Sequence, residues 1–332
     1  MRCKMCNIWD NPTKVSEEFK PELLEKLPKV DTVNITGGEP FVREDIEDIV
    51  KILFTKTKRI VFSTSGYYSD RIIQLARKYP QLGFRISIEG LSCKNDELRG
   101  RPGGFDKGLK TLLELRRMGV KDIGFGITVS NNNSSDMLQL YELNRNLKME
   151  FATASFHNSF YFHKYDNKVT NIDEVCGNFD ELIQRLMNEK HPKSWFRAFF
   201  NLGLINYVKG GRRMLPCEAG TENFFIDPYG NVLPCNGMEE SCWFDTMGNL
   251  HDVEDFMTLW TGAKAKAVRD KVANCPKSCW MIGSASPVMK KYITKVAPWV
   301  LKNKLKVMRG GRVDTTCIPF FHVGNNDKQG LR

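Results

Sequence analysis

The stretch Val33-Asn34-Ile35-Thr36-Gly37-Gly38-Glu39-Pro40 decides the fold of this 332-residue chain. A short β-branched run leads into two glycines and a glutamate, and a helical pattern begins near Arg43. Glycine lets the backbone approach a ligand closely, and the Glu39 carboxylate can accept hydrogen bonds from an ammonium group. A tight turn between a strand and a helix has the same pattern, so the neighbouring sequence must distinguish a binding site from a simple turn.

The alternation of strand and helix continues through the first half of the chain. From residue 30 to about residue 155, short β-branched runs alternate with longer helical patterns, which indicates βα units around a parallel sheet. Chemistry in such folds gathers at the C-terminal ends of the strands. We expect strands at 32–36, 59–63, 84–88, 123–129 and 150–155, and helices at 43–54, 69–78, 105–118 and 134–147, with two more helices within 172–209.

Composition places the chain among globular proteins. It is 41% hydrophobic, it has no apolar run long enough to cross a membrane, and its start does not have the pattern of a signal peptide, so we expect a cytoplasmic protein. Cytosolic thiols are kept reduced. The clustered members of the ten cysteines are therefore expected to bind metal rather than to form disulfides.

The net charge of +10 is densest near the C-terminus. Lysines and arginines gather between Lys290 and Arg312, among apolar residues such as Tyr292, Trp299 and Val300. This pattern favours an amphipathic terminal helix with a solvated basic face over a substrate-binding or membrane-surface segment. No interleaved basic and aromatic motif supports binding to DNA or RNA, so no nucleic-acid partner is expected.

Cys3 and Cys6 form a C-x2-C pair. Such a pair alone is typical of a zinc site, an iron–sulfur cluster or a redox dithiol. Together with the turn at 36–40, these residues resemble the radical S-adenosylmethionine (SAM) superfamily, whose cluster motif is C-x3-C-x2-C and whose second strand ends in Gly-Gly-Glu-Pro. The resemblance implies that three thiolates bind three irons of a 4Fe–4S cluster, and that the amino and carboxylate groups of SAM bind the fourth iron.

By this resemblance, Cys3 and Cys6 match the second and third cysteines of the cluster motif. The first cysteine would fall two residues before Met1, so we expect the chain to be truncated at its N-terminus. The resemblance implies an α/β fold, a partial (β/α)6 TIM-like barrel whose first strand is missing. A small cysteine-rich α+β domain is expected to follow it.

The resemblance also implies a set of residues at the SAM site. The residues alone also allow other interpretations. Glu89 could be an exposed carboxylate at a strand end, and Arg99 could form a salt bridge that caps the helix beginning near Phe105. No catalytic residue is predicted. The implied SAM-binding residues are Met5 beside the adenine, Gly37, Gly38 and Glu39 in the turn, Ser63 at the end of the predicted strand at 59–63, Ser87 and Glu89 at the ribose or methionine part, Arg99 at the carboxylate, and Thr128 near the adenine.

A second group of cysteines lies in the last third of the chain. Asp227-Pro228-Tyr229-Gly230 has good turn chemistry between two apolar runs and predicts a hairpin that brings Cys217 near Cys235. With Cys275 and Cys279, these residues resemble the auxiliary-cluster modules called SPASM and, in the shorter form, twitch. The resemblance implies one auxiliary cluster, expected to be 4Fe–4S, bound by all four thiolates. A zinc site with the same four ligands stays an alternative.

The other cysteines are not assigned to either site. Cys242 and Cys317 are either extra ligands or spare loop thiols, and Cys93 and Cys176 are expected to be unrelated to metal binding. His157, Tyr161, His163 and Tyr165 follow the fifth strand, where they either line the substrate end of the barrel or form an ordinary polar loop. We expect three segments: a core at 1–210, an auxiliary-cluster domain at 211–285, and a basic helical extension at 286–332.

The resemblance implies a radical SAM oxidoreductase or transferase. In such enzymes the first cluster reduces SAM, and the resulting 5′-deoxyadenosyl radical removes a hydrogen atom from a small-molecule or peptide substrate. An electron donor such as flavodoxin or ferredoxin is implied, and the auxiliary cluster transfers electrons or binds substrate. Two alternatives stay open, a non-catalytic iron–sulfur or electron-transfer protein and a zinc-stabilised nucleic-acid binder.

Overall fold

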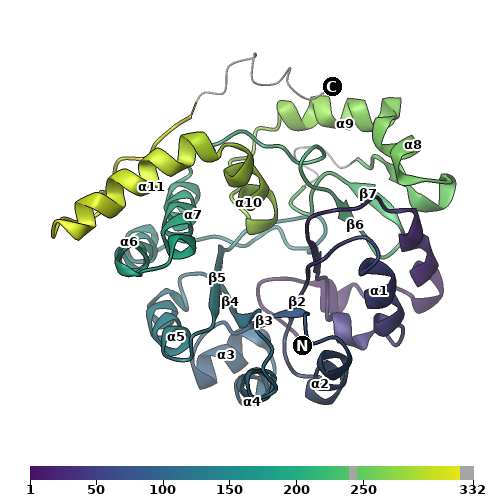
Figure 1. Cartoon of the computed structure of the whole chain (residues 1–332), viewed down its shortest axis with the longest axis horizontal. Coiled ribbons are helices and arrows are strands. Elements are labelled where there is room, and N and C mark those ends of the chain that lie inside the picture. The colour runs from purple at the N-terminus through teal and green to yellow at the C-terminus, as the bar shows by residue number, and fades with distance from the viewer. Residues whose placement is uncertain (239–244, 322–332) are drawn as a thin grey trace.

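The computed structural model describes residues 1–238 and 245–321. Its centre is a sheet of five parallel strands in sequential order, which curves into a half-barrel (Figure 1). The expected partial TIM-like barrel is confirmed, and each predicted strand lies within two residues of an observed one. The strands are β1 (Val33–Ile35), β2 (Ile60–Thr64), β3 (Gly83–Ser87), β4 (Ile123–Val129) and β5 (Glu150–Ser155).

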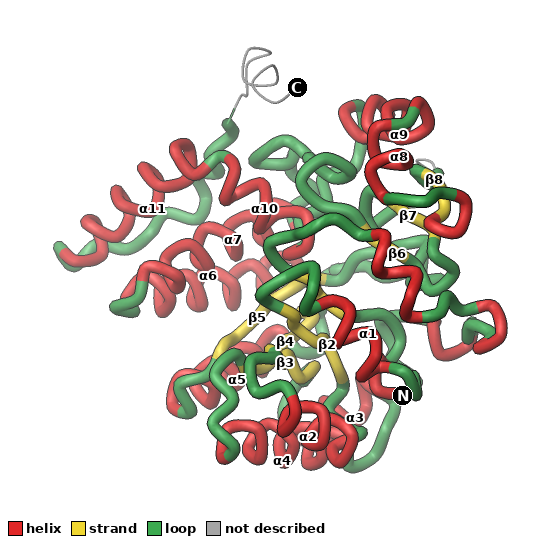
Figure 2. Tube along the Cα trace, turned by 45° about the vertical axis from the view of Figure 1, so that its right-hand side comes forward, coloured by secondary structure: helices red, strands yellow, loops and turns green. Residues whose placement is uncertain are grey.

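Helices cover the convex face of the sheet, whereas loops lie on its other side (Figure 2). The predictions for α2, α4 and α5 are correct to within one residue, but two others need correction. The helix predicted to begin at Arg43 begins at Ile46, because Arg43 has extended backbone and its guanidinium bonds to Asp45. Helix α3 was not predicted. The bounds are α1 (Ile46–Leu53), α2 (Ser69–Lys78), α3 (Ser92–Arg99), α4 (Gly104–Arg117) and α5 (Ser134–Asn146).

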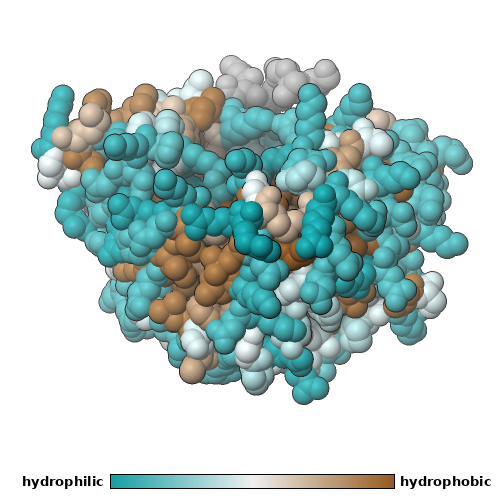
Figure 3. Space-filling model, turned by 60° about the horizontal axis from the view of Figure 1, so that its bottom comes forward, coloured by the Kyte–Doolittle hydropathy of each residue, from teal (hydrophilic) through white to brown (hydrophobic). Residues whose placement is uncertain are grey.

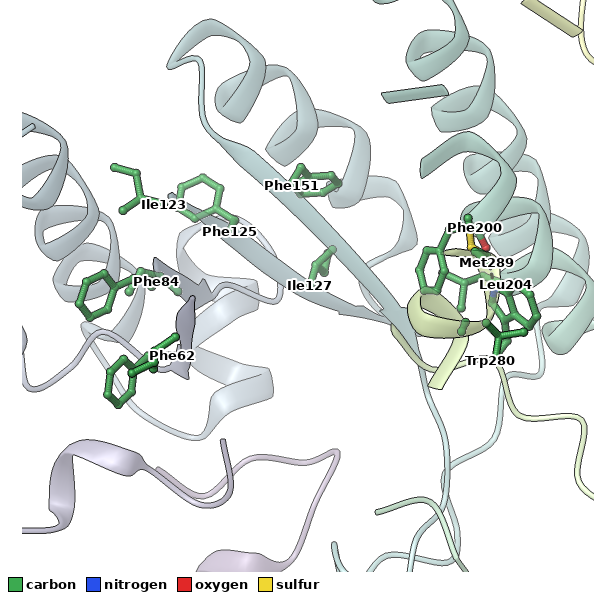
Figure 4. Packing of buried hydrophobic residues seen from close by; sticks show 14 of the residues in the cluster. Phe62, Phe84, Ile123, Phe125, Ile127, Phe151, Phe200, Leu204, Trp280 and Met289 are labelled. Carbon is green, nitrogen blue, oxygen red and sulfur yellow. Dashed lines mark hydrogen bonds between the residues drawn. The ribbon is translucent and has the colours of Figure 1, made fainter. Parts of the chain in front are cut away.

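Aromatic side chains fill the layer between sheet and helices. Phe62 and Phe84 are fully buried and stack with their ring centres 5.7 Å apart, and Phe125 and Phe151 continue the row across the sheet (Figure 4). Burying each ring stabilises the fold by roughly 1.5–3 kcal/mol. Because alternate residues of a strand point to opposite faces, this packing leaves the intervening positions for the concave side.

Two long helices follow the barrel strands, as predicted, α6 (Ile172–Asn188) and α7 (Pro192–Val208). The chain then forms a small antiparallel sheet of β6 (Phe225–Ile226), β7 (Asn231–Leu233) and β8 (Gly248–Asn249). The predicted hairpin is present, because the Asp227 carboxylate accepts hydrogen bonds from the backbone N–H groups of Tyr229 and Asn231 at 2.9 and 3.0 Å. Two helices complete this part, α8 (Phe256–Thr261) and α9 (Ala263–Ala273).

The basic segment forms two helices, α10 (Ile282–Lys291) and α11 (Ile293–Met308), and α11 packs against α6 and α7 (Figure 1). Trp280, just before α10, attaches this segment to α7. Its indole N–H donates to the Phe200 carbonyl at 2.9 Å, and its ring stacks on that of Phe200 (Figure 4). Short 3-10 helices occur at Ile8–Asp10, Val15–Glu17, Pro21–Lys26, Pro40–Val42 and Leu250–Asp252.

Candidate functional site

Cys3 and Cys6 lie on an irregular loop that is pressed against the end of α3. The backbone N–H of Lys4 donates to the Leu98 carbonyl at 2.8 Å. Gly100 ends α3 with a φ of +61°, and a side chain there would overlap the carbonyl of Arg2. Glycine is therefore required at this position, both for its conformation and for the approach of the cysteine loop.

The two thiols contact each other. The hydrogen bond from Cys6 lowers the pKa of Cys3 to about 6, with a smaller contribution from Arg99 and against the effect of burial. The same bond, together with burial, raises the pKa of Cys6. One thiolate is thus stabilised before any metal is present, which suits a site that binds metal through thiolates.

Arg99 and Glu89 form a buried ion pair beside this loop. Arg99 Nη1 donates to Glu89 Oε1 at 2.9 Å, and the side chains are only 11% and 3% exposed. The alternatives of an exposed Glu89 and of an Arg99 that caps the next helix are both wrong, because folding buries the two charges against each other. Burial raises the pKa of Glu89, and Arg99 opposes that shift. Burial alone would lower the pKa of Arg99. The negative groups Cys3, Glu89 and Glu39 outweigh that effect, so the pKa of Arg99 is raised overall.

Three further contacts hold Glu89 at the end of β3. Its second oxygen accepts the backbone N–H of Thr128 at 2.7 Å, so the structure brings Glu89, Arg99 and Thr128 together. Asn95 accepts the Glu89 N–H at 2.9 Å, and Asn133 donates to the Glu89 carbonyl at 2.7 Å. Both asparagines are fully buried and were not among the predicted residues. Asn133 lies four residues after the predicted strand at 123–129, whereas Asn95 lies seven residues after the predicted strand at 84–88, within a helix that was not predicted.

The Glu39 carboxylate is held by the end of β2. Thr64 Oγ1 donates to it at 2.6 Å and the Ser65 N–H at 2.9 Å. Ser63, the predicted residue of this turn, instead bonds to Asn34 at 3.3 Å. Thr64 and Ser65, which directly follow Ser63, are the residues that the prediction missed.

Small residues line the concave face beyond these charges. Ser87 is level with Gly126 on the neighbouring strand, and Thr128 is level with Ala154. Gly37 and Gly38 lie between β1 and the Pro40–Val42 turn, and a side chain on Gly37 would reach the Tyr161 hydroxyl. Gly37, Gly38, Ser87 and Thr128 therefore lie at or just beyond the carboxyl ends of their strands.

The loop at 156–168, after β5, contacts the first cysteine loop. Asn7 donates to the carbonyls of Phe162 and His163 at 2.8 and 2.9 Å, and Asn167 donates to the Met5 carbonyl at 2.9 Å. The Met5 backbone is thereby held in place. Whether the Met5 side chain packs on adenine stays a prediction.

The same loop also contacts the second cysteine region. Ser159 bonds to the Asn236 carbonyl, and the Phe160 N–H donates to the Met238 carbonyl at 2.6 Å, just beyond Cys235. Tyr161 packs edge-on against Phe225 of β6, with ring centres 4.7 Å apart. The loop at 156–168 therefore joins the two cysteine sites, and its polar residues serve at least this structural purpose.

Cys217, Cys235, Cys275 and Cys279 line one cavity together with Val272 and Met238. Burial raises the pKa of Cys235 to about 12 and also raises that of Cys279, with the neighbouring thiols adding to both shifts. Metal ligation replaces these thiol protons, so the donor set fits a thiolate-bound cluster. Among the described residues, no three Cys, His, Asp or Glu side chains converge as ligands of a single ion.

Three further cysteines do not belong to this cavity. Cys93 and Cys317 are exposed and Cys176 is buried, and none of the three lines the cavity. Cys242 lies outside the described residues. In the described part of the chain, no helix is both long and apolar enough to pass through a membrane.

Comparison with family models identifies two regions. Residues 1–143 match the model of the radical SAM superfamily, and residues 217–281 match SPASM, an iron–sulfur cluster-binding domain. A radical SAM domain implies a 4Fe–4S cluster and SAM, and a SPASM domain implies an auxiliary iron–sulfur cluster. The second match contains all four cysteines of the cavity.

Similar curated proteins act on different kinds of molecule, judging by their names. Fe-coproporphyrin III synthase of Methanosarcina barkeri is 32% identical over 43% of this chain and 37% of its own length. The sporulation killing factor maturation protein SkfB of Bacillus subtilis is 25% identical over 80% of this chain and 62% of its own length. The chain thus spans less than two thirds of either protein.

Solved structures share the fold at low sequence identity. Native anSMEcpe with bound AdoMet and Cp18Cys peptide has a TM-score of 0.58 and 13% identity, with 92% of this chain and 96% of that chain covered. Streptococcus suis SuiB bound to S-adenosylmethionine has a TM-score of 0.53 and 16% identity, with 79% and 60% covered.

Proposed function

Since this chain carries a radical SAM domain followed by a SPASM domain, we propose that it is an enzyme that cleaves SAM reductively and removes a hydrogen atom from its substrate. The observation that carries the proposal is the charge arrangement around Arg99. One buried cation faces Cys3, Glu89 and Glu39, which come from three separate segments of the chain. A zwitterionic cosubstrate such as SAM needs such a set of fixed charges of both signs.

Different residues at the first site would bind the cluster and SAM. Cys3 and Cys6 would hold two irons of the 4Fe–4S cluster, and the third thiolate belongs to the position that the family motif places before Cys3. When bound, this cluster supplies the electron that splits SAM. The Glu39 carboxylate accepts hydrogen bonds from the ammonium group of SAM, and the Arg99 guanidinium attracts the carboxylate of SAM. The small residues of β3 to β5 leave space for the nucleoside.

The four cysteines of the second site would hold an auxiliary 4Fe–4S cluster. Four thiolates leave no iron open, so we assign this site to electron transfer rather than to substrate ligation. The loop at 156–168 bonds to both sites and sets their relative position. An electron donor such as flavodoxin or ferredoxin would supply the first electron.

The substrate is a peptide or a small molecule. SkfB is named as a maturation protein, whereas Fe-coproporphyrin III synthase is named for a tetrapyrrole product.

Iron and sulfide content after anaerobic reconstitution tests the proposal. We expect about four irons in this chain and about eight in a chain extended upstream so that a cysteine precedes Met1 by two positions, because each complete thiolate set binds one four-iron cluster. With a strong reductant, the extended chain should release 5′-deoxyadenosine and methionine from SAM. A Cys3→Ala/Cys6→Ala variant of it is the control. A colourless extended chain that leaves SAM intact would refute the proposal.

A further inference from the structure

Helix α11 has two apolar faces. Val296 and Val300 are buried against the preceding helices, and Trp299 packs edge-on against Phe199 with ring centres 5.2 Å apart. Leu301, Leu305 and Met308 lie on the other face. Their spacing of four and three residues aligns them along one side of the helix. Their side chains are 55%, 52% and 70% exposed, so this stripe has no partner in the described chain.

The whole charge excess of the protein lies in the same part of the chain. Residues 271–313 contain ten lysines and arginines and no acidic residue, which equals the net charge of +10. The rest of the chain is therefore neutral overall. Lys302, Lys306 and Arg309 are exposed and flank the apolar stripe on one side of α11. None of these three takes part in a salt bridge within residues 1–238 and 245–321.

The remaining cations near the stripe are already engaged. Lys290 pairs with Asp31, Lys291 with Glu218 and Glu222, and Arg312 with Asp180. Lys304 donates to the Met187 carbonyl at 2.8 Å. Lys302, Lys306 and Arg309, beside Leu301, Leu305 and Met308, are thus left without a salt bridge to the described residues. In the space-filling view, brown and teal residues alternate along the upper left edge, on the side where Figure 1 places α11 (Figure 3).

We propose that this face of α11 docks on an anionic phospholipid surface. An apolar stripe that enters the acyl boundary, beside lysines and arginine that meet anionic headgroups, is the pattern of a helix that lies in a membrane interface. A second copy of this chain is disfavoured, because it would bring two strongly basic faces together. A nucleic acid would use the cations but not the leucines. The docking is peripheral and independent of the SAM chemistry proposed above.

Vesicle co-sedimentation of the reconstituted full chain tests this proposal. We expect binding to phosphatidylcholine vesicles that contain phosphatidylglycerol, little binding to phosphatidylcholine alone, and weakening by salt. Leu301→Ser/Leu305→Ser and Lys302→Glu/Lys306→Glu should each reduce binding by about tenfold or more. Leu113→Ser/Lys110→Glu, a matched exposed pair on α4, should bind like the unchanged chain.

Other outcomes would overturn the proposal. Absence of binding to the anionic vesicles, or equal binding by the α11 and α4 variants, would refute it. A third outcome is that the protein does not bind the vesicles but binds an acidic polypeptide such as polyglutamate. If Lys302→Glu/Lys306→Glu abolishes that binding, the face is a protein-docking surface instead. Iron content and thermal midpoint should be unchanged in all variants, which separates lost docking from lost folding.

Discussion

The two cysteine sites of this protein are built in opposite ways. At the first site, two thiols lie on a loop beside the buried pair of Arg99 and Glu89, and the Glu39 carboxylate is within electrostatic reach. At the second site, four thiols line a cavity whose other walls include Val272 and Met238. Charges are retained where a charged cosubstrate is proposed to bind. Where only a cluster is expected, four thiols dominate the lining, which includes Lys277 but, among the described residues, no carboxylate.

This contrast separates two kinds of structural cost. Burying Arg99 and Glu89 is unfavourable unless each compensates the other, so the first site depends on a few exact contacts. Burying thiols costs little, because a neutral thiol behaves like a small apolar group. The second site depends instead on metal to join the three chain segments that carry its four cysteines. The following substitutions test that difference.

The largest effect is expected at the second site from Cys235→Ser. Removal of one of four ligands should abolish the auxiliary cluster and with it about four irons per chain. The visible absorption of the reconstituted protein should fall accordingly, and its thermal midpoint should decrease, because metal binding there contributes to folding. Cys317→Ser is the control, since Cys317 is exposed and outside the cavity. Unchanged iron content in Cys235→Ser would mean that the cavity is not a cluster site.

At the first site, Arg99→Met should destabilise the protein by about 3–5 kcal/mol, because Glu89 would be left buried without its cation. Urea denaturation of the metal-free protein measures this loss. The double variant Arg99→Met/Glu89→Gln should recover part of it, since the uncompensated charge is gone. If the double variant is as unstable as the single one, packing rather than charge explains the effect.

Gly100→Ala tests how closely the cysteine loop must approach α3. Its positive φ costs about 1–2 kcal/mol for any other residue, and the added methyl group would also displace the loop at Arg2. Gly119 has a φ of +84° with no atom within 4 Å of the added methyl group, so Gly119→Ala measures the conformational cost alone. We expect Gly100→Ala to lose more stability than Gly119→Ala. We also expect the alkylation rates of Cys3 and Cys6 to become more similar in Gly100→Ala. Equal losses in both variants would show that the close approach is unimportant.

The smallest effect is expected where the two sites meet. Tyr161→Leu removes the edge-on contact with Phe225 and should cost about 0.5–1.5 kcal/mol beyond the change in buried area. Tyr161→Phe retains the ring and should be nearly neutral in thermal unfolding. A large loss in Tyr161→Phe would instead assign the main role to the hydroxyl beside Gly37.

Local patterns predicted most of the fold. The strands and α2, α4 and α5 repeat apolar residues with the period of their element, so a short window is enough to recognise them. Helix α3 escaped prediction because only Asn95 and Leu98 of it are buried, which leaves no apolar stripe. Its position is determined by contacts with the cysteine loop and with Glu89, far away in the sequence or across a turn.

The candidate site shows the same limit. Its residue types and its strand-end positions were visible in the sequence, but the choice of Thr64 and Ser65 over Ser63 was not. The predicted strand ended at Ser63, whereas β2 ends at Thr64. Because neighbouring strand residues point in opposite directions, Ser63 bonds to Asn34 while Thr64 bonds to Glu39, and Ser65 reaches Glu39 from the turn beyond the strand.

The sequence by itself determined the repeated βα units, the two sets of cysteines and the hairpin between Cys217 and Cys235, because each depends on spacing within a short segment. Only the tertiary structure decided that Arg99 is buried against Glu89, that the loop at 156–168 joins both cysteine sites, and that α11 leaves Leu301, Leu305 and Met308 uncovered. Burial and pairing depend on which distant segments come together, and a local pattern does not contain that information.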